Sequence, residues 1–153
     1  MITSGGKLKI IAEENKYNHI IIPGNHPPRA MFGYAFTELF FMLNHYGIID
    51  DAFKNDFEKT ITLLDAEKED IQKQAMELAK KMHKQTPVIY VANGFEGVAV
   101  RFRQQLNENS KMLAWHNVIP EMNHNELLGW RTNVNNLAVV YFRNKCDYKR
   151  NQI

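Results

Sequence analysis

The sequence predicts an α/β fold in which helices flank a parallel sheet. Residues 87–92 form a short apolar run, residues 93–97 form a glycine-containing turn, and a helical pattern follows as far as about Asn109. A strand, a turn and a helix in this order make half of a parallel α/β unit. Residues 137–142 form a second apolar run of strand length. With 153 residues, the chain is long enough for one ordinary domain with a sizeable core.

The first fifteen residues allow two interpretations. A group of small residues that includes Ser4 and Gly5 precedes a short amphipathic helix at residues 7–15. In the first interpretation, the N-terminus is flexible and Ser4 caps the helix. In the second, a strand end and a glycine turn lead into the helix, whose free backbone N–H groups face an anion or a polyol.

A buried strand is predicted at residues 18–24, where three isoleucines precede a Pro-Gly turn. Pro28 suits the first position of the next helix, which is predicted from Ala30 to about Tyr46. Arg29 lies in the first turn of this helix, where it either extends a solvated head from an apolar stem or holds an anion at the positive helix end. The later face of the helix is predicted to lie in the core through Phe32, Phe36, Leu39, Phe40 and Leu43.

Two more helices follow, one at residues 48–64 and one that begins at Asp65. The apolar face of the second of these contains Ile71, Ala75, Leu78, Ala79 and Met82. Its side rich in lysine and glutamate is predicted to be solvated surface. Further along the chain, residues 111–115 are predicted to form a short strand and residues 131–136 a polar hairpin or loop. The tail at residues 143–153 is polar and shows no closing helix.

Residues 120–130 form the most chemically informative stretch of the chain. Four consecutive polar residues, 123–126, stand between a Pro-Glu-Met segment and an apolar Leu-Leu-Gly-Trp segment here. The apolar segment is predicted to hold the Glu126 carboxylate half-buried beside His124, and partial burial makes a carboxylate a stronger base. The alternative is a helix N-terminus in which Asn123 is the cap and Glu126 occupies the third helical position. Spacing alone leaves both interpretations open.

Metal and nucleophilic chemistry are poorly supported by the sequence. The residues that could form a metal cluster are His116, Glu121, His124 and Glu126. Their spacing fits no zinc helix motif, and Cys146 is the only cysteine. Ser4 and Ser110 have no histidine near them in sequence, so neither is a favoured nucleophile. Proton transfer by Glu126, with an arginine and polar neighbours to stabilise an oxyanion, is the simplest enzymatic interpretation.

Composition limits the classes of partner and the expected location. Hydrophobic residues make up 44% of the chain and charged residues 24%, as in a soluble globular protein. The net charge of +2 comes from interspersed acids and bases, which gives no electrostatic footprint for nucleic acid. No apolar run approaches the roughly 20 residues that a membrane span needs. A lone cysteine favours a reducing compartment, and the cytoplasm is the expected location.

Five motifs in register resemble the bifunctional phosphoglucose/phosphomannose isomerases, enzymes with two sugar-isomerase (SIS) domains. Together they span almost the whole chain in family order. They are Thr-Ser-Gly-Gly-Lys-Leu at residues 3–8, Ile-Pro-Gly at 22–24 with Pro-Pro-Arg-Ala-Met-Phe-Gly-Tyr at 27–34, Pro-Val-Ile-Tyr at 87–90, Arg-Phe-Arg-Gln-Gln-Leu-Asn-Glu-Asn-Ser-Lys at 101–111, and Pro-Glu-Met-Asn-His-Asn-Glu-Leu-Leu-Gly-Trp at 120–130. The resemblance implies a three-layer, Rossmann-like SIS fold with a parallel sheet between helices.

The resemblance also implies a reaction and a set of site residues. The reaction is the interconversion of glucose 6-phosphate or mannose 6-phosphate with fructose 6-phosphate through a cis-enediol. Glu126 matches the family's base, which moves a proton between C1 and C2, and Arg29 matches an arginine that stabilises the enediolate. The expected substrate-binding residues are Ser4, Gly5, Pro28 and His124. The family implies no metal and no organic cofactor, and it implies a homodimer because its sites form at subunit contacts.

Departures from the family pattern shape the expected domain organisation. The phosphate-gripping loop of the first SIS domain has no match, and Tyr148 stands roughly where a ring-opening histidine is expected. Residues 1–30 are therefore expected to be the end of a first SIS domain and a crossover. Residues 31–153 are expected to be a second SIS domain without its C-terminal elements, inactive alone. The alternative function is a non-catalytic sugar-phosphate-binding SIS module of a regulator, although no DNA-binding helix-turn-helix is visible.

Overall fold

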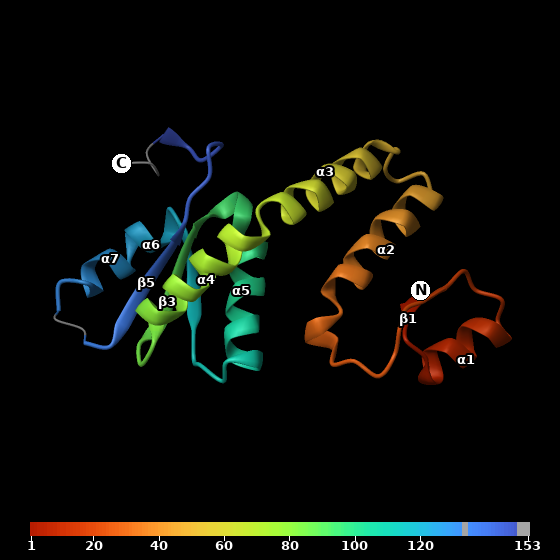
Figure 1. Cartoon of the computed structure of the whole chain (residues 1–153), viewed down its shortest axis with the longest axis horizontal. Helices are drawn as coiled ribbons and strands as arrows, with labels where there is room; N and C mark the ends of the chain where they lie inside the picture. The colour runs from red at the N-terminus through yellow and green to blue at the C-terminus, as the bar shows by residue number, and fades with distance from the viewer. Residues whose placement is uncertain (133–134, 150–153) are drawn as a thin grey trace. The chain divides into compact units, whose positions relative to one another are not determined.

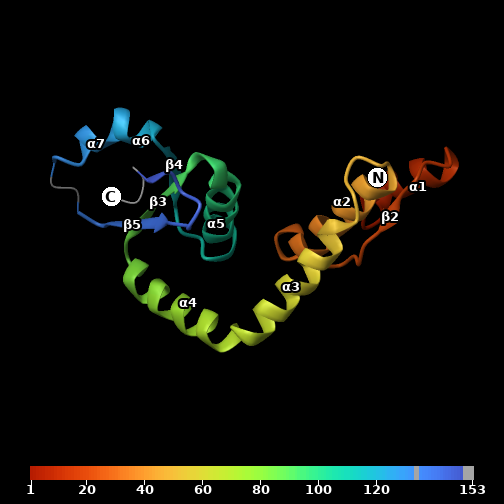
Figure 2. The ribbon, with the colours of Figure 1, turned by 90° about the horizontal axis from the view of Figure 1, so that it is seen from above.

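The computed structural model describes residues 1–132 and 135–149. By the density of its internal contacts the chain divides into two compact units, Met1–Lys68 and Glu69–Ile153, and each is described by itself. Figures 1 and 2 show the elements of both units. The predicted domain boundary after residue 30 refers to the domains of a longer family member and stays a prediction.

The N-terminal unit begins with a strand, a turn and a helix. β1 (Ile2–Thr3) pairs in parallel with β2 (Ile20–Ile21), and α1 (Gly6–Glu14) lies between them in the sequence. Gly5 is the N-cap of α1, has a φ of 140°, and donates its N–H to the Thr3 hydroxyl at 3.2 Å. The prediction of a flexible N-terminus capped by Ser4 is wrong, since Thr3 organises this turn. The alternative of a strand end and a glycine turn is confirmed.

The strand predicted at residues 18–24 is much shorter and more exposed than expected. Only Ile20 and Ile21 pair with β1, and 47% of Ile21 is exposed. Pro23 lacks a backbone N–H and so cannot extend the ladder. The prediction of a buried strand is therefore wrong in both length and burial, because a two-residue ladder leaves one of its faces open.

Aromatic rings join the two long helices of the N-terminal unit. The 3₁₀ helix η1 (Pro28–Ala30) has Pro28 at its start and precedes α2 (Phe32–His45), and α3 (Ala52–Ala66) follows. Ring pairs between α2 and α3 have centroid distances of 5.3–6.1 Å, and they are Phe36–Phe57, Phe40–Phe53, Phe40–Phe57 and Phe41–Phe53. Phe53 is buried, but no residue of α2 is. The prediction that this face of α2 is buried in the core is therefore wrong, because α3 covers only part of each ring.

The C-terminal unit contains a three-stranded parallel sheet. The strands β3 (Thr86–Ala92), β4 (Trp115–Ile119) and β5 (Leu137–Phe142) lie in the order β4-β3-β5. Both apolar runs that predicted strands are confirmed. Because β3 is the central strand, every residue from Pro87 to Ala92 is buried. Continuous apolar runs are typical of parallel strands that are covered on both faces.

The strand predicted at residues 111–115 is wrong. The chain leaves α5 (Glu96–Asn109) and turns at Lys111, whose φ is 55°. The backbone N–H of Ala114 then binds the Asn107 side chain at 3.0 Å, so this segment is a connection. The strand itself begins at Trp115 and runs through polar residues that were not expected to pair.

Helices cover both faces of this sheet and give it three layers. One core cluster lies against α4 (Lys68–Met82) and α5 and includes Met82, Ile89 and Leu106. The other lies against the short helices α6 (Glu121–His124) and α7 (Glu126–Gly129). The elements of both layers can be followed in Figure 2. Met82 and Leu78 of the predicted α4 face pack on the core, whereas Ile71 is 45% exposed, so only the C-terminal part of that face is covered.

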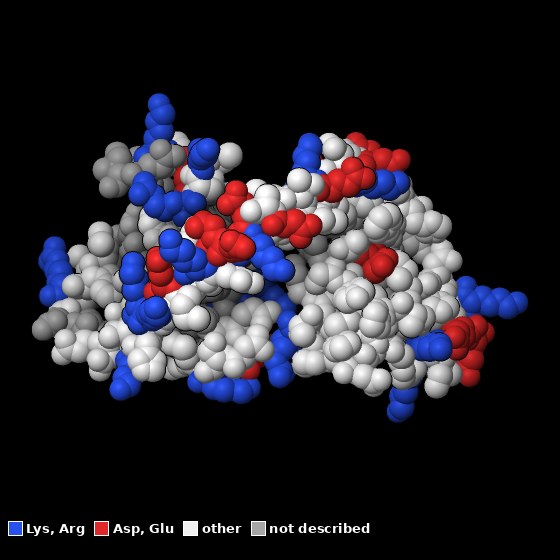
Figure 3. Space-filling model, viewed as in Figure 1, with Lys and Arg blue, Asp and Glu red and all other residues white. Residues whose placement is uncertain are grey.

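Charged side chains of both signs are mixed on the face shown in Figure 3, as the interspersed sequence predicts. Among the described residues, no helix combines the length and apolar character that a membrane crossing requires.

A matched pair of strand substitutions tests the assignment of the core. Val91 is 1% exposed and Val139 is 54% exposed. Val91→Ala should lower the free energy of unfolding by about 2 kcal/mol, because it removes two buried carbon groups and leaves a cavity. Val139→Ala should change it by less than about 0.5 kcal/mol. Trp115 and Trp130, the only tryptophans, both lie in the C-terminal unit, so their fluorescence during urea unfolding reports this unit. Equal losses from the two variants would contradict the assignment.

Candidate functional site

Glu126 is the first residue of α7, and its carboxylate points back to the sheet. Asn125 is the N-cap of this helix, and its side chain accepts the Glu126 backbone N–H at 2.6 Å. One carboxylate oxygen of Glu126 accepts the Tyr90 hydroxyl at 2.7 Å, and the other accepts the Asn117 amide at 2.6 Å. The side chain is half-buried. Both carboxylate oxygens are thus held by neutral donors.

Strand register explains why these two donors meet. Tyr90 of β3 and Asn117 of β4 are Cα partners in the parallel ladder. Side chains of paired residues point to the same face of a sheet, and alternate residues along one strand share a face. Val88 and Tyr90 belong to the core cluster beneath α6 and α7, whereas Ile89 and Val91 belong to the other cluster. The register therefore places a phenol and an amide side by side under α7.

Trp130 completes this polar cluster inside an apolar setting. Its indole N–H donates to the Tyr90 hydroxyl at 2.9 Å, and the two rings meet edge to face with centroids 6.4 Å apart. Burial raises the pKa of Tyr90 to about 12, and its hydrogen bond to Glu126 acts in the same direction. A hollow of about 240 Å³ lies beside the cluster, lined by Val88, Tyr90, Trp115, Glu126, Gly129, Trp130 and Leu137.

The structure corrects one local prediction and adds three residues to the site. Asn123 is not the cap of the helix that carries Glu126. The helical conformation is interrupted at Asn125 between α6 and α7, so Glu126 is the first residue of α7. Sequence reasoning did not select Tyr90, Asn117 or Trp130 as site residues. The available signal for Tyr90 was a polar head within an otherwise apolar buried strand. Asn117 carried no usable signal once the limits of β4 were misplaced.

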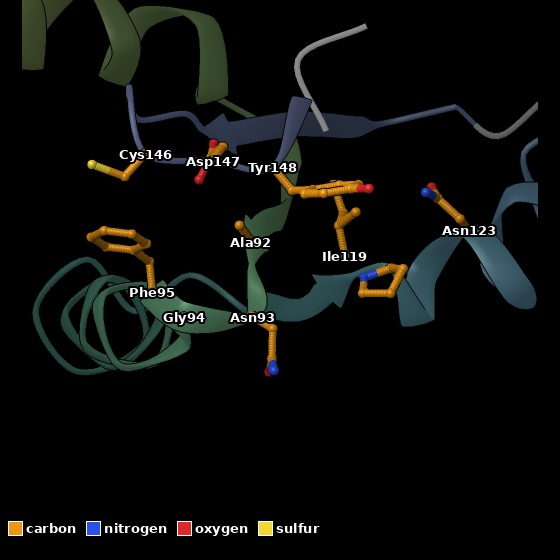
Figure 4. Close-up of a pocket in the computed structure, with 10 residues that line it drawn as sticks. Ala92, Asn93, Gly94, Phe95, Ile119, Asn123, Cys146, Asp147 and Tyr148 are labelled. Atoms are coloured by element: carbon orange, nitrogen blue, oxygen red, sulfur yellow. The ribbon is translucent and has the colours of Figure 1, made fainter. Parts of the chain in front are cut away.

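A second hollow, of about 660 Å³, lies at the carboxyl ends of β3 and β4. The loop after β3 leads to α5 on one face, whereas the chain after β4 leads to α6 on the other. Adjacent strands whose connections diverge in this way form a topological switch point, where ligands of open α/β sheets bind. In Figure 4, Phe95 lies across the hollow from Cys146 and Asp147, and the Tyr148 ring lies on the side of Asn123. This hollow shares no lining residue with the one beside Glu126.

The other predicted site residues belong to other elements of the two units. His124 is exposed at the end of α6. Ser4 and Gly5 form the turn between β1 and α1, and Pro28 and Arg29 belong to η1. All four of these residues lie in the N-terminal unit, whereas Glu126 lies in the C-terminal unit. The pairing of Arg29 with Glu126 stays a prediction. No cluster of three or more metal-ligating side chains occurs in residues 1–132 and 135–149.

The raised pKa of Tyr90 predicts a loss of stability at alkaline pH. The folded protein holds this proton up to about pH 12, whereas an ordinary tyrosine in the unfolded chain loses it near pH 10.0. The stability that the protonated Tyr90 contributes is complete below pH 10.0. The free energy of unfolding should then fall as the pH rises from 10.0 to about 12. Tyr90→Phe should remove that part of the decline, as measured by urea unfolding at several pH values. Tyr148→Phe changes a tyrosine that is 71% exposed and should retain the decline; a decline unchanged in Tyr90→Phe would refute the assignment.

Comparison with known proteins identifies relatives that act on hexose phosphates. A bifunctional phosphoglucose/phosphomannose isomerase from Caldicellulosiruptor bescii is 36% identical over 99% of this chain and 48% of its own length. One from Aquifex aeolicus is 32% identical over 84% of this chain and 38% of its own. A D-glucosamine-6-phosphate 4-epimerase from Sulfolobus acidocaldarius is 34% identical over 83% of this chain and 40% of its own. The chain spans about half the length, or less, of these relatives.

The family model agrees with these similarities and with the observed layers. No solved structure gives a significant match to the chain. The model of the bacterial phospho-glucose isomerase C-terminal SIS domain matches residues 71–153, which is more than half of the chain and nearly the whole C-terminal unit. The parallel sheet covered by helices on both faces is the α/β architecture that the motifs predicted. The chain belongs to the bacterial phospho-glucose isomerase C-terminal SIS domain family.

Proposed function

We propose that this chain supplies the base for aldose–ketose isomerisation of hexose 6-phosphates. Glucose 6-phosphate and mannose 6-phosphate are the proposed aldoses, and fructose 6-phosphate is the ketose. The observation that carries the proposal is the Glu126 carboxylate, which is half-buried, fixed at both oxygens by neutral donors and open to a hollow. A base for carbon needs a held carboxylate of this kind, because an exposed one is hydrated and mobile.

The proposed reaction moves one proton between neighbouring carbons. Glu126 takes the proton from C2 of the open-chain aldose, and the C2–H electron pair forms the C1–C2 double bond of a cis-enediolate. The carboxylic acid then returns the proton to C1, while the proton of the C2 hydroxyl passes to the oxygen of C1, which leaves the carbonyl at C2. Arg29 is the proposed partner of the enediolate oxygens, since a guanidinium stabilises charge that develops in the transition state.

The names of the relatives support the substrate class more broadly than the reaction. Two of them are named for phosphoglucose and phosphomannose isomerisation and one for the 4-epimerisation of glucosamine 6-phosphate. A phosphorylated six-carbon sugar is common to all three names. The second candidate function, a sugar-phosphate-binding module without catalysis, predicts binding without any need for Glu126 to be a carboxylate. A homodimer and a cytoplasmic location remain part of the proposal.

The decisive variant is Glu126→Gln, assayed with fructose 6-phosphate. The assay uses this chain and a chimera that joins it to the remaining half of the Caldicellulosiruptor bescii relative. Replacing the base should lower kcat by about a thousandfold, because general base catalysis contributes roughly 10²–10⁴. Melting temperatures should fall by only a few degrees, because the amide oxygen can still accept from Tyr90 although its NH₂ group then faces that of Asn117.

Glu121→Gln is the matched control, because Glu121 lies five residues earlier and is exposed, and its carboxylate accepts from Asn125 at 2.9 Å, as a glutamine oxygen also can. Its kcat should remain within about twofold of the parent. Full activity in Glu126→Gln would refute the base assignment. A chimera without activity whose melting temperature still rises with fructose 6-phosphate would favour the binding module.

A further inference from the structure

Two side chains on neighbouring strands reach the Glu126 carboxylate from below. Tyr90 comes from the central strand β3 and Asn117 from its register partner in β4. They donate to different oxygens of the carboxylate, at 2.7 and 2.6 Å. A carboxylate with one donor can still rotate about its last bond, whereas one with a donor at each oxygen is fixed in its plane. The strands therefore set the orientation of Glu126.

The two donors are themselves fixed by further hydrogen bonds. The Tyr90 hydroxyl accepts the Trp130 indole N–H, so its single proton is directed to Glu126. The Asn117 side-chain oxygen accepts the Val118 backbone N–H at 2.8 Å, which fixes the amide so that its NH₂ group faces Glu126. Tyr90 is only 4% exposed, so its ring has little room to move. Each donor thus has one arrangement that satisfies all of its partners.

We infer that Tyr90 and Asn117 are positioning residues that hold the Glu126 carboxylate for proton transfer. The inference rests on the proposed function of Glu126 as the base. Both donors are uncharged, and each carboxylate oxygen has two lone-pair directions, so one on each remains for a substrate proton. The high pKa of Tyr90 keeps it a donor at every pH near neutrality. Trp130 acts one step further away, through the Tyr90 hydroxyl.

The test separates kcat from KM in the active chimera. Tyr90→Phe keeps the ring and removes one donor, and Asn117→Ala removes the other. Each should lower kcat by about 10- to 100-fold, because small misplacements of a reacting group cost that much, and should leave KM within about threefold. Tyr141→Phe is the matched control, since Tyr141 is the register partner of Tyr90 on the other side, in β5, and its kcat should stay within about twofold.

A double-mutant cycle distinguishes positioning from a general loss of structure. If Tyr90 acts through Glu126, adding Tyr90→Phe to Glu126→Gln should cost little further activity, because the group that it positions is already gone. If the double variant instead loses the product of the two single losses in kcat, the inference is overturned while Glu126 remains the proposed base. Unchanged kcat in both Tyr90→Phe and Asn117→Ala, with kcat lost in Glu126→Gln, would also overturn it. Unchanged kcat in Glu126→Gln would instead overturn the proposed function.

A readout independent of activity keeps the inference testable if the chimera is inert. The side-chain carboxyl ¹³C resonance of Glu126 depends on the hydrogen bonds to its oxygens. It should shift in Tyr90→Phe and in Asn117→Ala and stay in place in Tyr141→Phe, in a chain whose unfolding midpoint shows that it remains folded. A resonance that moves in neither donor variant would show that the two donors do not hold the carboxylate.

Discussion

The hydrogen bond between the Tyr90 hydroxyl and the Glu126 carboxylate links the packing of the C-terminal unit to its polar cluster. This contact crosses 36 residues and ties α7 to the central strand of the sheet. A half-buried carboxylate without partners would be costly, so the two donors lower the free energy of the α6 and α7 layer on this face. The apolar contacts of Met122 and Trp130 with the same face then close around a polar centre. Packing and chemistry therefore share one group of residues.

That sharing explains how one contact can serve both stability and reaction. A structural anchor for α7 needs only a hydrogen bond, which a glutamine could also make. A base needs a carboxylate whose orientation is fixed and whose charge is not neutralised by a cation. The uncharged donors Tyr90 and Asn117 meet the second requirement, and the adjoining hollow gives the carboxylate an open side. The arrangement is therefore more specific than a helix anchor requires.

The sequence predicted what depends on continuous local patterns and missed what depends on register. β3 and β5 were predictable because each is an unbroken apolar run, and α5 because a glycine turn precedes its periodic pattern. β4 was misplaced because the polar His116 and Asn117 interrupt its apolar character, although one of them faces Glu126. The half-buried state of Glu126 was one of two open predictions, and its expected cause was wrong in part, because Leu127 and Leu128 are 54% and 59% exposed and only Trp130 of that segment packs on the core cluster. Its donors were not predicted, because only the pairing of β3 with β4 brings them under α7.

The two hollows described above differ in the part of the proposed substrate, a hexose 6-phosphate, that they suit. The larger one is lined by Asn93 and Asn123, by the Tyr148 phenol and by Asp147, and none of its described lining residues is a lysine or an arginine. A carboxylate at Asp147 would repel a phosphate, whereas amides and a phenol pair well with sugar hydroxyls. The hollow beside Glu126 is mostly apolar and aromatic and suits the carbon skeleton that the proposed base would reach. Among the described lining residues, therefore, neither hollow offers a cation for the phosphate of the proposed substrate.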